Sequence, residues 1–270
     1  MRSGKMLMTA VLLVGIQGCA PSREEIAEEL YSEAIEAFSG KKMGHARELL
    51  DSIILNYSDM PTAVREARDL QKLVTIYEQE RTLHYLDSLQ DELEHEIRPL
   101  MEQVAIDDKN SPTPVMVHKS QQTYRAMGRC YIRAYVEPNG QFYISSNYTG
   151  EHGIHHNSIK VIVGDDYVQT DTVSEEPYNH TFSDGEMVWE TVKYKNGLGD
   201  NAARLIAENA DKKVSVAYVG AKGKYMTVMT ETDKEAIRDV WRLGVLLRES
   251  AHTKGQIRST RMLINKTRNM

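Results

Sequence analysis

The first half of the chain carries apolar residues at the three- and four-residue spacing of amphipathic helices, with almost no Gly or Pro. A first helix is predicted to begin after Ser22, which forms a capping box with Glu25, and to end at Gly40. A second helix follows after a linker short enough to force the two helices antiparallel. The apolar positions of the pair are Ile26, Leu30, Ala34, Ile35, Phe38, Ala46, Leu49, Leu50, Ile53, Ile54 and Tyr57.

A third helix is predicted after the turn at Pro61, and it is expected to continue as far as Pro99. Its second half places apolar residues at helical spacing among many acidic ones. These residues are Leu83, Leu86, Leu89, Leu93 and Ile97. They fit either a face that packs within the same chain or a coiled-coil seam for a partner, and the first alternative is favoured because it needs no second molecule.

After about residue 122 the pattern changes to the strict alternation of β-strands. In RCYIRAYVEPNGQFYIS, the turn Glu137 to Gly140 joins two strands. One face is aliphatic, with Cys130, Ile132, Ala134, Val136, Phe142 and Ile144. The other, which we call the tyrosine face, consists of Tyr131, Arg133, Tyr135 and Tyr143.

The tyrosine face has two interpretations. Exposed tyrosines form a platform that stacks on sugar rings or docks another protein. Alternatively, a helix containing Trp241 covers this face, and the tyrosines are half-buried packing.

Further strands and two helices are predicted beyond this hairpin. The strands lie near 158–163, 167–172, 187–195, 213–219 and 224–230, and the helices lie near 201–209 and from Thr232 onward. The fold class is therefore α+β, with an N-terminal antiparallel helical-repeat domain followed by a mainly antiparallel sheet or sandwich with added helices.

The first residues have the layout of a secretory signal: basic Arg2 and Lys5, then an uncharged run too short to span a bilayer. Ile16, Gly18 and Cys19 resemble the lipobox of bacterial lipoproteins, from which Gln17 departs. The resemblance implies that Cys19 carries acyl chains that hold the protein on a membrane. By the same resemblance, Ala20 favours the outer membrane. An ordinary cleaved secretion signal is the alternative.

A second resemblance covers residues 26–77. Small and apolar residues at helical spacing there look like a tetratricopeptide-type helical hairpin followed by the start of the next unit. The residues that carry it are Tyr31, Ala34, Phe38, Gly40, Ala46, Leu49, Leu50, Ile53, Ile54, Tyr57, Ala63 and Ala67. Such hairpins are common in envelope lipoproteins, and the extended third helix is expected to cover the open side.

These observations divide the chain into five predicted segments. They are a signal peptide at 1–18, a tetratricopeptide-like helical domain at 19–106, a linker at 107–122, a β-rich α+β domain at 123–250 and a basic tail at 251–270. The tail is expected to lie against the acidic helical domain, with anionic lipid as the alternative.

Cysteine usage and charge restrict the partners. The chain has two cysteines, so lipidation of Cys19 leaves Cys130 without a disulfide partner, and we interpret Cys130 as a small buried hydrophobe. The net charge of -6 becomes more negative when Arg2 and Lys5 are removed with the signal. An acidic protein is a poor nucleic-acid binder.

Catalytic signals are absent from the sequence. It has no nucleophile elbow, no H-E-x-x-H, no C-x-x-C and no phosphate-binding loop. His152 and His155, with His180 as a distant third ligand, are a weak metal candidate, and a polar turn is the favoured interpretation.

We therefore expect a non-enzymatic, cofactor-free scaffold or adaptor that is lipid-anchored in the cell envelope and binds other envelope proteins. The alternative is a lipoprotein that binds a glycan or small ligand on the tyrosine face. A metal-dependent hydrolase is a weaker alternative.

Overall fold

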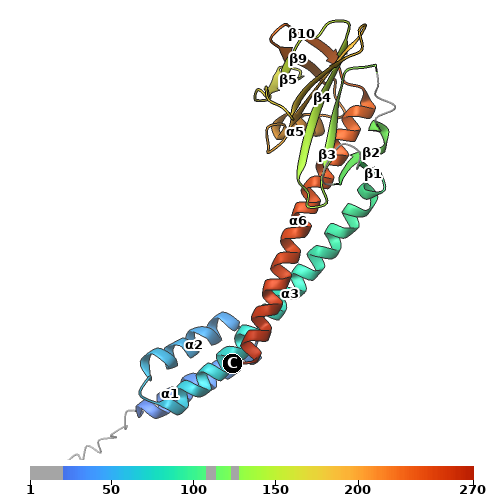
Figure 1. The fold of residues 1–270 in the computed structure, drawn as a ribbon. Helices are drawn as coiled ribbons and strands as arrows, with labels where there is room; N and C mark the ends of the chain where they lie inside the picture. The colour runs from blue at the N-terminus through green and yellow to red at the C-terminus, as the bar shows by residue number, and fades with distance from the viewer. Residues whose placement is uncertain (1–20, 108–113, 123–127) are drawn as a thin grey trace, which may run out of the picture. The chain divides into compact units, whose positions relative to one another are not determined.

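The computed structural model describes residues 21–107, 114–122 and 128–270 of the chain. The fold is α+β, with N-terminal helices followed by antiparallel sheets and added helices, so the predicted class is confirmed (Figure 1). The described residues form two compact units. We call residues 21–81 with Met262–Met270 the hairpin unit and Thr82–Arg261 the sheet unit. Cys19 lies outside the described residues, so its lipidation stays a prediction.

The hairpin unit is built from α1 (Arg23–Ser39), α2 (Met43–Asn56) and the first part of α3 (Pro61–Met101). The predicted capping box is present: the Glu25 N–H donates to Ser22 Oγ at 3.1 Å, and the Ser22 N–H donates to the Glu25 carboxylate at 2.6 Å. The small and apolar residues of the repeat-like pattern form its core. Fully buried members are Ala34, Ala46, Leu50, Ile53, Ala67 and Val74.

The second part of α3 belongs to the sheet unit, where it pairs with α6 (Glu231–Arg268). Leu86 and Leu93 of the apolar series are buried, and Gln90 Nε2 donates to Ser250 Oγ at 2.9 Å. The leucine spacing therefore serves packing within the chain, and the predicted domain boundary at residue 106 differs from the division into units. None of the described helices combines the length and apolar character that a membrane span requires.

The predicted tail at 251–270 is not a separate segment, because α6 continues without a break to Arg268. Its cations face acidic residues of α3: Lys254 pairs with Glu94 at 3.2 Å, and Arg261 pairs with Asp87 at 3.2 Å. These exposed pairs place opposite charges on two adjacent helix faces, and each contributes little to stability. This agrees with the expected placement of the basic residues against acidic helix.

The sheet unit contains two antiparallel sheets. Sheet A has the strand order β1 (Val104–Asp107), β2 (Val115–His118), β3 (Tyr131–Val136), β4 (Phe142–Gly150), β8 (Val188–Tyr194), β7 (Asn179–Ser183). Sheet B has the order β10 (Gly223–Val228), β9 (Ser215–Gly220), β5 (His156–Val163), β6 (Asp166–Gln169). A short 3-10 helix, η1 (Lys119–Gln121), and α5 (Asp200–Glu208) complete the unit.

Two parts of sheet A differ from the sequence prediction. The segment 107–122 was predicted to be a linker, but it contains β2 and η1, and β1 ends in it. β7 was not predicted at all. The short strands β1 and β2 form one side of the sheet and β7 forms the other, and pairing within a sheet stabilises such strands more than their own composition does.

The β3–β4 hairpin has the predicted register, with Tyr135 opposite Tyr143. Gly140 takes a φ of 83° at the turn, as predicted for a residue that accepts positive φ. The aliphatic face packs in a core shared by both sheets, α5 and α6, and Trp241 packs against this core. The helix containing Trp241 therefore covers the aliphatic face and leaves the tyrosine face uncovered by it.

Candidate functional site

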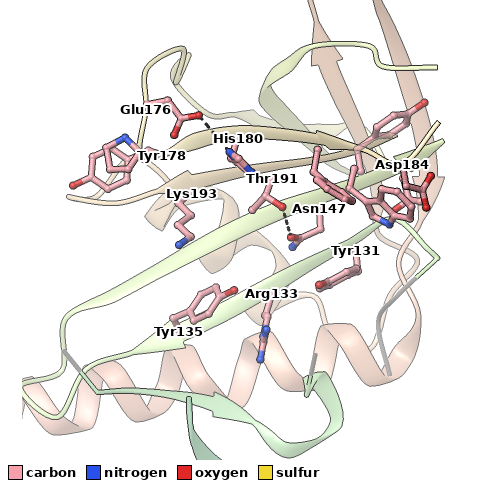
Figure 2. Close-up of a pocket in the computed structure, with 15 residues that line it drawn as sticks. Tyr131, Arg133, Tyr135, Asn147, Glu176, Tyr178, His180, Asp184, Thr191 and Lys193 are labelled. Carbon is pink, nitrogen blue, oxygen red and sulfur yellow. Dashed lines mark hydrogen bonds and ion pairs between the residues drawn. The ribbon is translucent and has the colours of Figure 1, made fainter. Parts of the chain in front are cut away.

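A cleft with a volume of about 730 Å³ lies on the face of sheet A that carries the predicted tyrosines (Figure 2). β3, β4 and β8 form its floor, and β7 with the segment before it forms one wall. The lining includes Tyr131, Arg133 and Tyr135 from the predicted face. Pockets of this size commonly hold small organic ligands.

Strand register explains why these side chains meet, because residues opposite each other on neighbouring strands share a face. Three rows of paired residues run across sheet A beneath and beside the cleft, from its floor to its wall, and all their members except the buried Ser145 line it. They are Thr149, Trp189 and Phe182; then Tyr131, Asn147, Thr191 and His180; then Arg133, Ser145 and Lys193. The rows run from an aromatic end, through a polar middle, to a cationic end.

The aromatic end consists of Phe182 and Trp189, whose ring centroids lie 5.6 Å apart. Phe182 is 57% exposed, although it is a large apolar residue on an edge strand. Trp189 is half-buried, so the pair offers one exposed and one partly covered aromatic ring as a contact surface for a flat, ring-shaped group. In the polar middle, Thr191 Oγ1 donates to Asn147 Oδ1 at 3.1 Å, which orients the amide within the cleft.

The four predicted tyrosine-face residues do not all reach the cleft. Tyr143 is only 3% exposed and does not line it, because its ring stacks on Tyr135 at 4.7 Å and packs with Val115 and Val117. Burial raises the pKa of Tyr143 well above its ordinary value. Tyr143 therefore packs beside Tyr135 on the same face and is not a contact residue.

Tyr131 lies in the middle row, with the Arg129 guanidinium 5.2 Å from its ring centroid. Burial, followed by the neighbouring Tyr135, raises the pKa of Tyr131 to about 12. Its hydroxyl therefore stays protonated at neutral pH and can donate a hydrogen bond to a ligand.

The cationic end contains Arg133 and Lys193. Arg133 pairs with Asp107 at 3.1 Å and lies over the Tyr135 ring at 5.3 Å. Burial, and then repulsion from Lys195, lower the pKa of Lys193 from its ordinary value. Because Asp107 offsets the charge of Arg133, Lys193 and Lys195 give this end of the cleft its positive charge among the described residues.

Sequence reasoning missed most of the far side of the cleft. A strand was predicted at 187–195, and alternation along it places Trp189, Thr191 and Lys193 on one face. However, no nearby sequence feature indicated that this face lies beside the tyrosines. Phe182 and His180 lie on β7, which was not predicted. The pairing of His180 with Thr191 and of Phe182 with Trp189 brings them to the cleft.

The histidines proposed as weak metal ligands do not form a ligand set. His152 and His155 are exposed, whereas His180 lies in the cleft with its Nδ1 3.4 Å from Glu176. Across the described residues, no group of three or more His, Cys, Asp and Glu side chains is arranged to hold a metal ion.

A second polar constellation lies inside the core, between the two sheets. His156 Nδ1 is 2.8 Å from Glu190 Oε2, and His156 Nε2 is 2.8 Å from Ser146 Oγ. The Glu190 carboxylate also accepts the backbone N–H groups of His155 and His156. Ser146, His156 and Glu190 are hydrogen-bonded in the same order as the nucleophile, base and acid of a catalytic triad. However, all three residues are at most 1% exposed, so a substrate cannot reach the hydroxyl in this conformation.

In comparisons with known proteins, no family model, no curated protein and no solved structure gives a significant match to this chain.

Proposed function

We propose that this protein is a lipid-anchored, non-catalytic binding protein of the cell envelope, and that its cleft on sheet A binds a glycan. The observation that carries the proposal is the cleft floor itself. Three predicted residues, Tyr131, Arg133 and Tyr135, line a cavity together with the exposed Phe182 and the half-buried Trp189. The proposed location rests on the lipobox resemblance at Cys19.

The side chains of the cleft match the chemistry of a sugar. A sugar ring presents an apolar face of C–H groups and an edge of hydroxyls, so it is held by aromatic rings together with amide and hydroxyl groups. Trp189 and Phe182 supply the rings, and Asn147 and Thr191 supply hydrogen-bonding groups one row away. Hydrophobic surface with a few placed polar groups is typical of ligand pockets.

The test uses the position of the two tryptophans in the chain. Trp189 lines the cleft, whereas Trp241 packs against the core. In a Trp241→Phe background, the fluorescence of Trp189 is expected to change when a glycan from a screening array binds. The variant Phe182→Ala should weaken that binding about tenfold, since a stacked aromatic contact contributes about 0.5–1.5 kcal/mol beyond its buried area.

Tyr167→Ala is the matched control. Tyr167 is 61% exposed, close to the 57% of Phe182, but it lies on β6 of sheet B, outside the cleft. Removal of the Tyr167 ring should leave the affinity for the glycan unchanged. A glycan that binds equally well to both variants, or the absence of any glycan that alters Trp189 fluorescence, would contradict the proposal.

The proposed anchor is tested separately. Radiolabelled palmitate should be incorporated into the native protein and not into a Cys19→Ser variant. Unlabelled native protein would remove the proposed membrane location while leaving the cleft experiment unaffected.

Binding of an envelope protein to the hairpin unit is a second candidate function. It is favoured by Leu55, which is 75% exposed, and Leu73, which is 52% exposed, both on helices of that unit. A contiguous apolar patch marks a protein contact surface, so this candidate requires Leu55 and Leu73 to contribute to one contact. Cross-linked partners that are lost with Leu55→Lys and retained with Phe182→Ala would support it.

A further inference from the structure

We propose that the ligand of the cleft is an acidic glycan, and that Lys193 binds its negatively charged group at the cationic end. The inference rests on the proposed glycan-binding function and adds the chemical class of the glycan. It follows from the position of Lys193, from the charges around it and from the spacing of the two ends of the cleft.

Lys193 is placed on the cleft floor by its strand register. It lies opposite Ser145 of β4, and Ser145 lies opposite Arg133 of β3. The Lys193 backbone N–H donates to the Tyr178 carbonyl at 2.7 Å, which ties this row to the wall of the cleft. Figure 2 shows Lys193 on the floor, between Tyr178 on the wall and Arg133 on β3.

The charge of Lys193 is not neutralised by a carboxylate close to it. Among the described residues, none places a carboxylate oxygen within 4 Å of the ammonium nitrogen. The nearby acid Asp107 is engaged with Arg133 at 3.1 Å. Lys195 adds a further positive charge, with its ammonium 4.5 Å from the Tyr143 ring centroid. Among the described residues around Lys193, the charges therefore sum to a positive value in a partly desolvated site, where a ligand anion would form strong charge-assisted hydrogen bonds.

The acidic groups of the cleft do not cancel this potential. Glu176 is largely exposed and faces His180 on the wall. Asp184 is also exposed and accepts the Met187 N–H at 3.2 Å. Figure 2 shows Asp184 at the opposite end of the cleft from Lys193. Water and salt screen exposed charges more than half-buried ones.

The spacing of the two ends indicates an elongated ligand. Trp189 and Lys193 are four residues apart on β8, and a strand rises about 3.3 Å per residue, so their positions lie roughly 13 Å apart along the strand. A ligand that stacks at the aromatic end and reaches Lys193 is longer than one sugar ring. The cleft therefore fits an oligosaccharide with an anionic group displaced from the stacked ring.

The experiment compares three forms of one oligosaccharide: a uronic acid form, the same molecule with its carboxylates reduced to alcohols, and a phosphorylated form. Affinities are measured by calorimetry and by Trp189 fluorescence in the Trp241→Phe background. A carboxylate or phosphate form should bind about tenfold or more tightly than the reduced form, because a hydrogen bond to a charged group contributes about 1.5–3 kcal/mol. The tighter of the two charged forms identifies the anion.

Lys193→Gln should abolish this preference, and it should weaken the binding of the charged forms far more than the binding of the reduced oligosaccharide. Lys160→Gln is the control, because Lys160 lies on sheet B with its ammonium over the Tyr167 ring. Equal affinity for the charged and reduced forms, or a preference that survives Lys193→Gln, would overturn the inference while the proposed function stands. If none of the three forms binds and the array also finds no glycan, the proposed function fails as well.

Discussion

The sheet unit contains two histidine–glutamate pairs that have the same chemistry in opposite surroundings. His156 and Glu190 lie 2.8 Å apart with both side chains 0% exposed, whereas His180 and Glu176 lie 3.4 Å apart with 65% and 69% exposure. The buried pair joins sheet B to sheet A, because His156 is on β5 and Glu190 is on β8. The exposed pair stands on the wall of the cleft.

The comparison indicates that burial, and not residue type, decides what such a pair does. In the core, each unsatisfied polar atom costs its full desolvation energy, so the pair is held by additional partners: two backbone N–H groups and the Ser146 hydroxyl. At the surface, water replaces any lost partner, and the side chains remain available to a ligand.

The largest expected difference between the buried pair and the exposed pair is in their contribution to the stability of the fold. Glu190→Gln should lower the free energy of unfolding by about 3 kcal/mol or more, because the amide cannot accept all three N–H groups that the carboxylate accepts and a buried network is broken. Urea denaturation measures the effect. A loss below about 1 kcal/mol would show that the buried pair is not a structural link between the sheets.

Ser146→Ala should cost less, about 1–2 kcal/mol, because it removes one neutral partner and leaves the carboxylate paired. The hydroxyl lies 2.8 Å from His156 Nε2 and 3.1 Å from the Tyr194 hydroxyl, so the variant leaves both without this partner. A cost equal to that of Glu190→Gln would mean that the serine, and not the carboxylate, is the centre of the network.

Acid pH should reproduce part of the Glu190 effect. Burial acts to raise the pKa of Glu190, but the hydrogen bonds from the His156 ring and from the backbone of His156 and His155 outweigh it, so the pKa lies below its ordinary value of 4.5. A lowered folded-state pKa contributes stability above the unfolded-state pKa, and this contribution is lost as pH falls through the folded value. Between about pH 6 and about pH 3, the native protein should therefore lose more stability than Glu190→Gln does. Equal losses of unfolding free energy in the native protein and in Glu190→Gln over this pH range would contradict a lowered pKa of Glu190.

The smallest expected effect on stability is that of Glu176→Gln, within about 0.5 kcal/mol, because exposed ion pairs contribute little. Because Glu176 lines the cleft, its substitution should alter glycan affinity measured by calorimetry without a change in the urea midpoint. A large fall in stability would remove the contrast between the two pairs.

The candidate site could be predicted only in part from the sequence. Tyr131, Arg133 and Tyr135 were predicted to share a face because alternation along one strand is a local property of the chain. The partners on β8 were missed because their approach depends on its pairing with β4, and these two strands lie more than thirty residues apart in the chain. Those on β7 were missed because that strand was not predicted. Tyr143 was assigned correctly to that face, but its burial depends on Val115 and Val117, which lie in the segment predicted to be a linker.

The sequence by itself determined the α+β class, the capped first helix, the leucine-bearing third helix and the Glu137 to Gly140 turn, since each depends on periodicity or on residues within a few positions of one another. Only the tertiary structure decided that Ser146, His156 and Glu190 meet in the core and that Trp189, Tyr131 and Lys193 share a cleft. The physical reason is that register between distant strands is set by burying the whole apolar face at once, and no short segment contains that information.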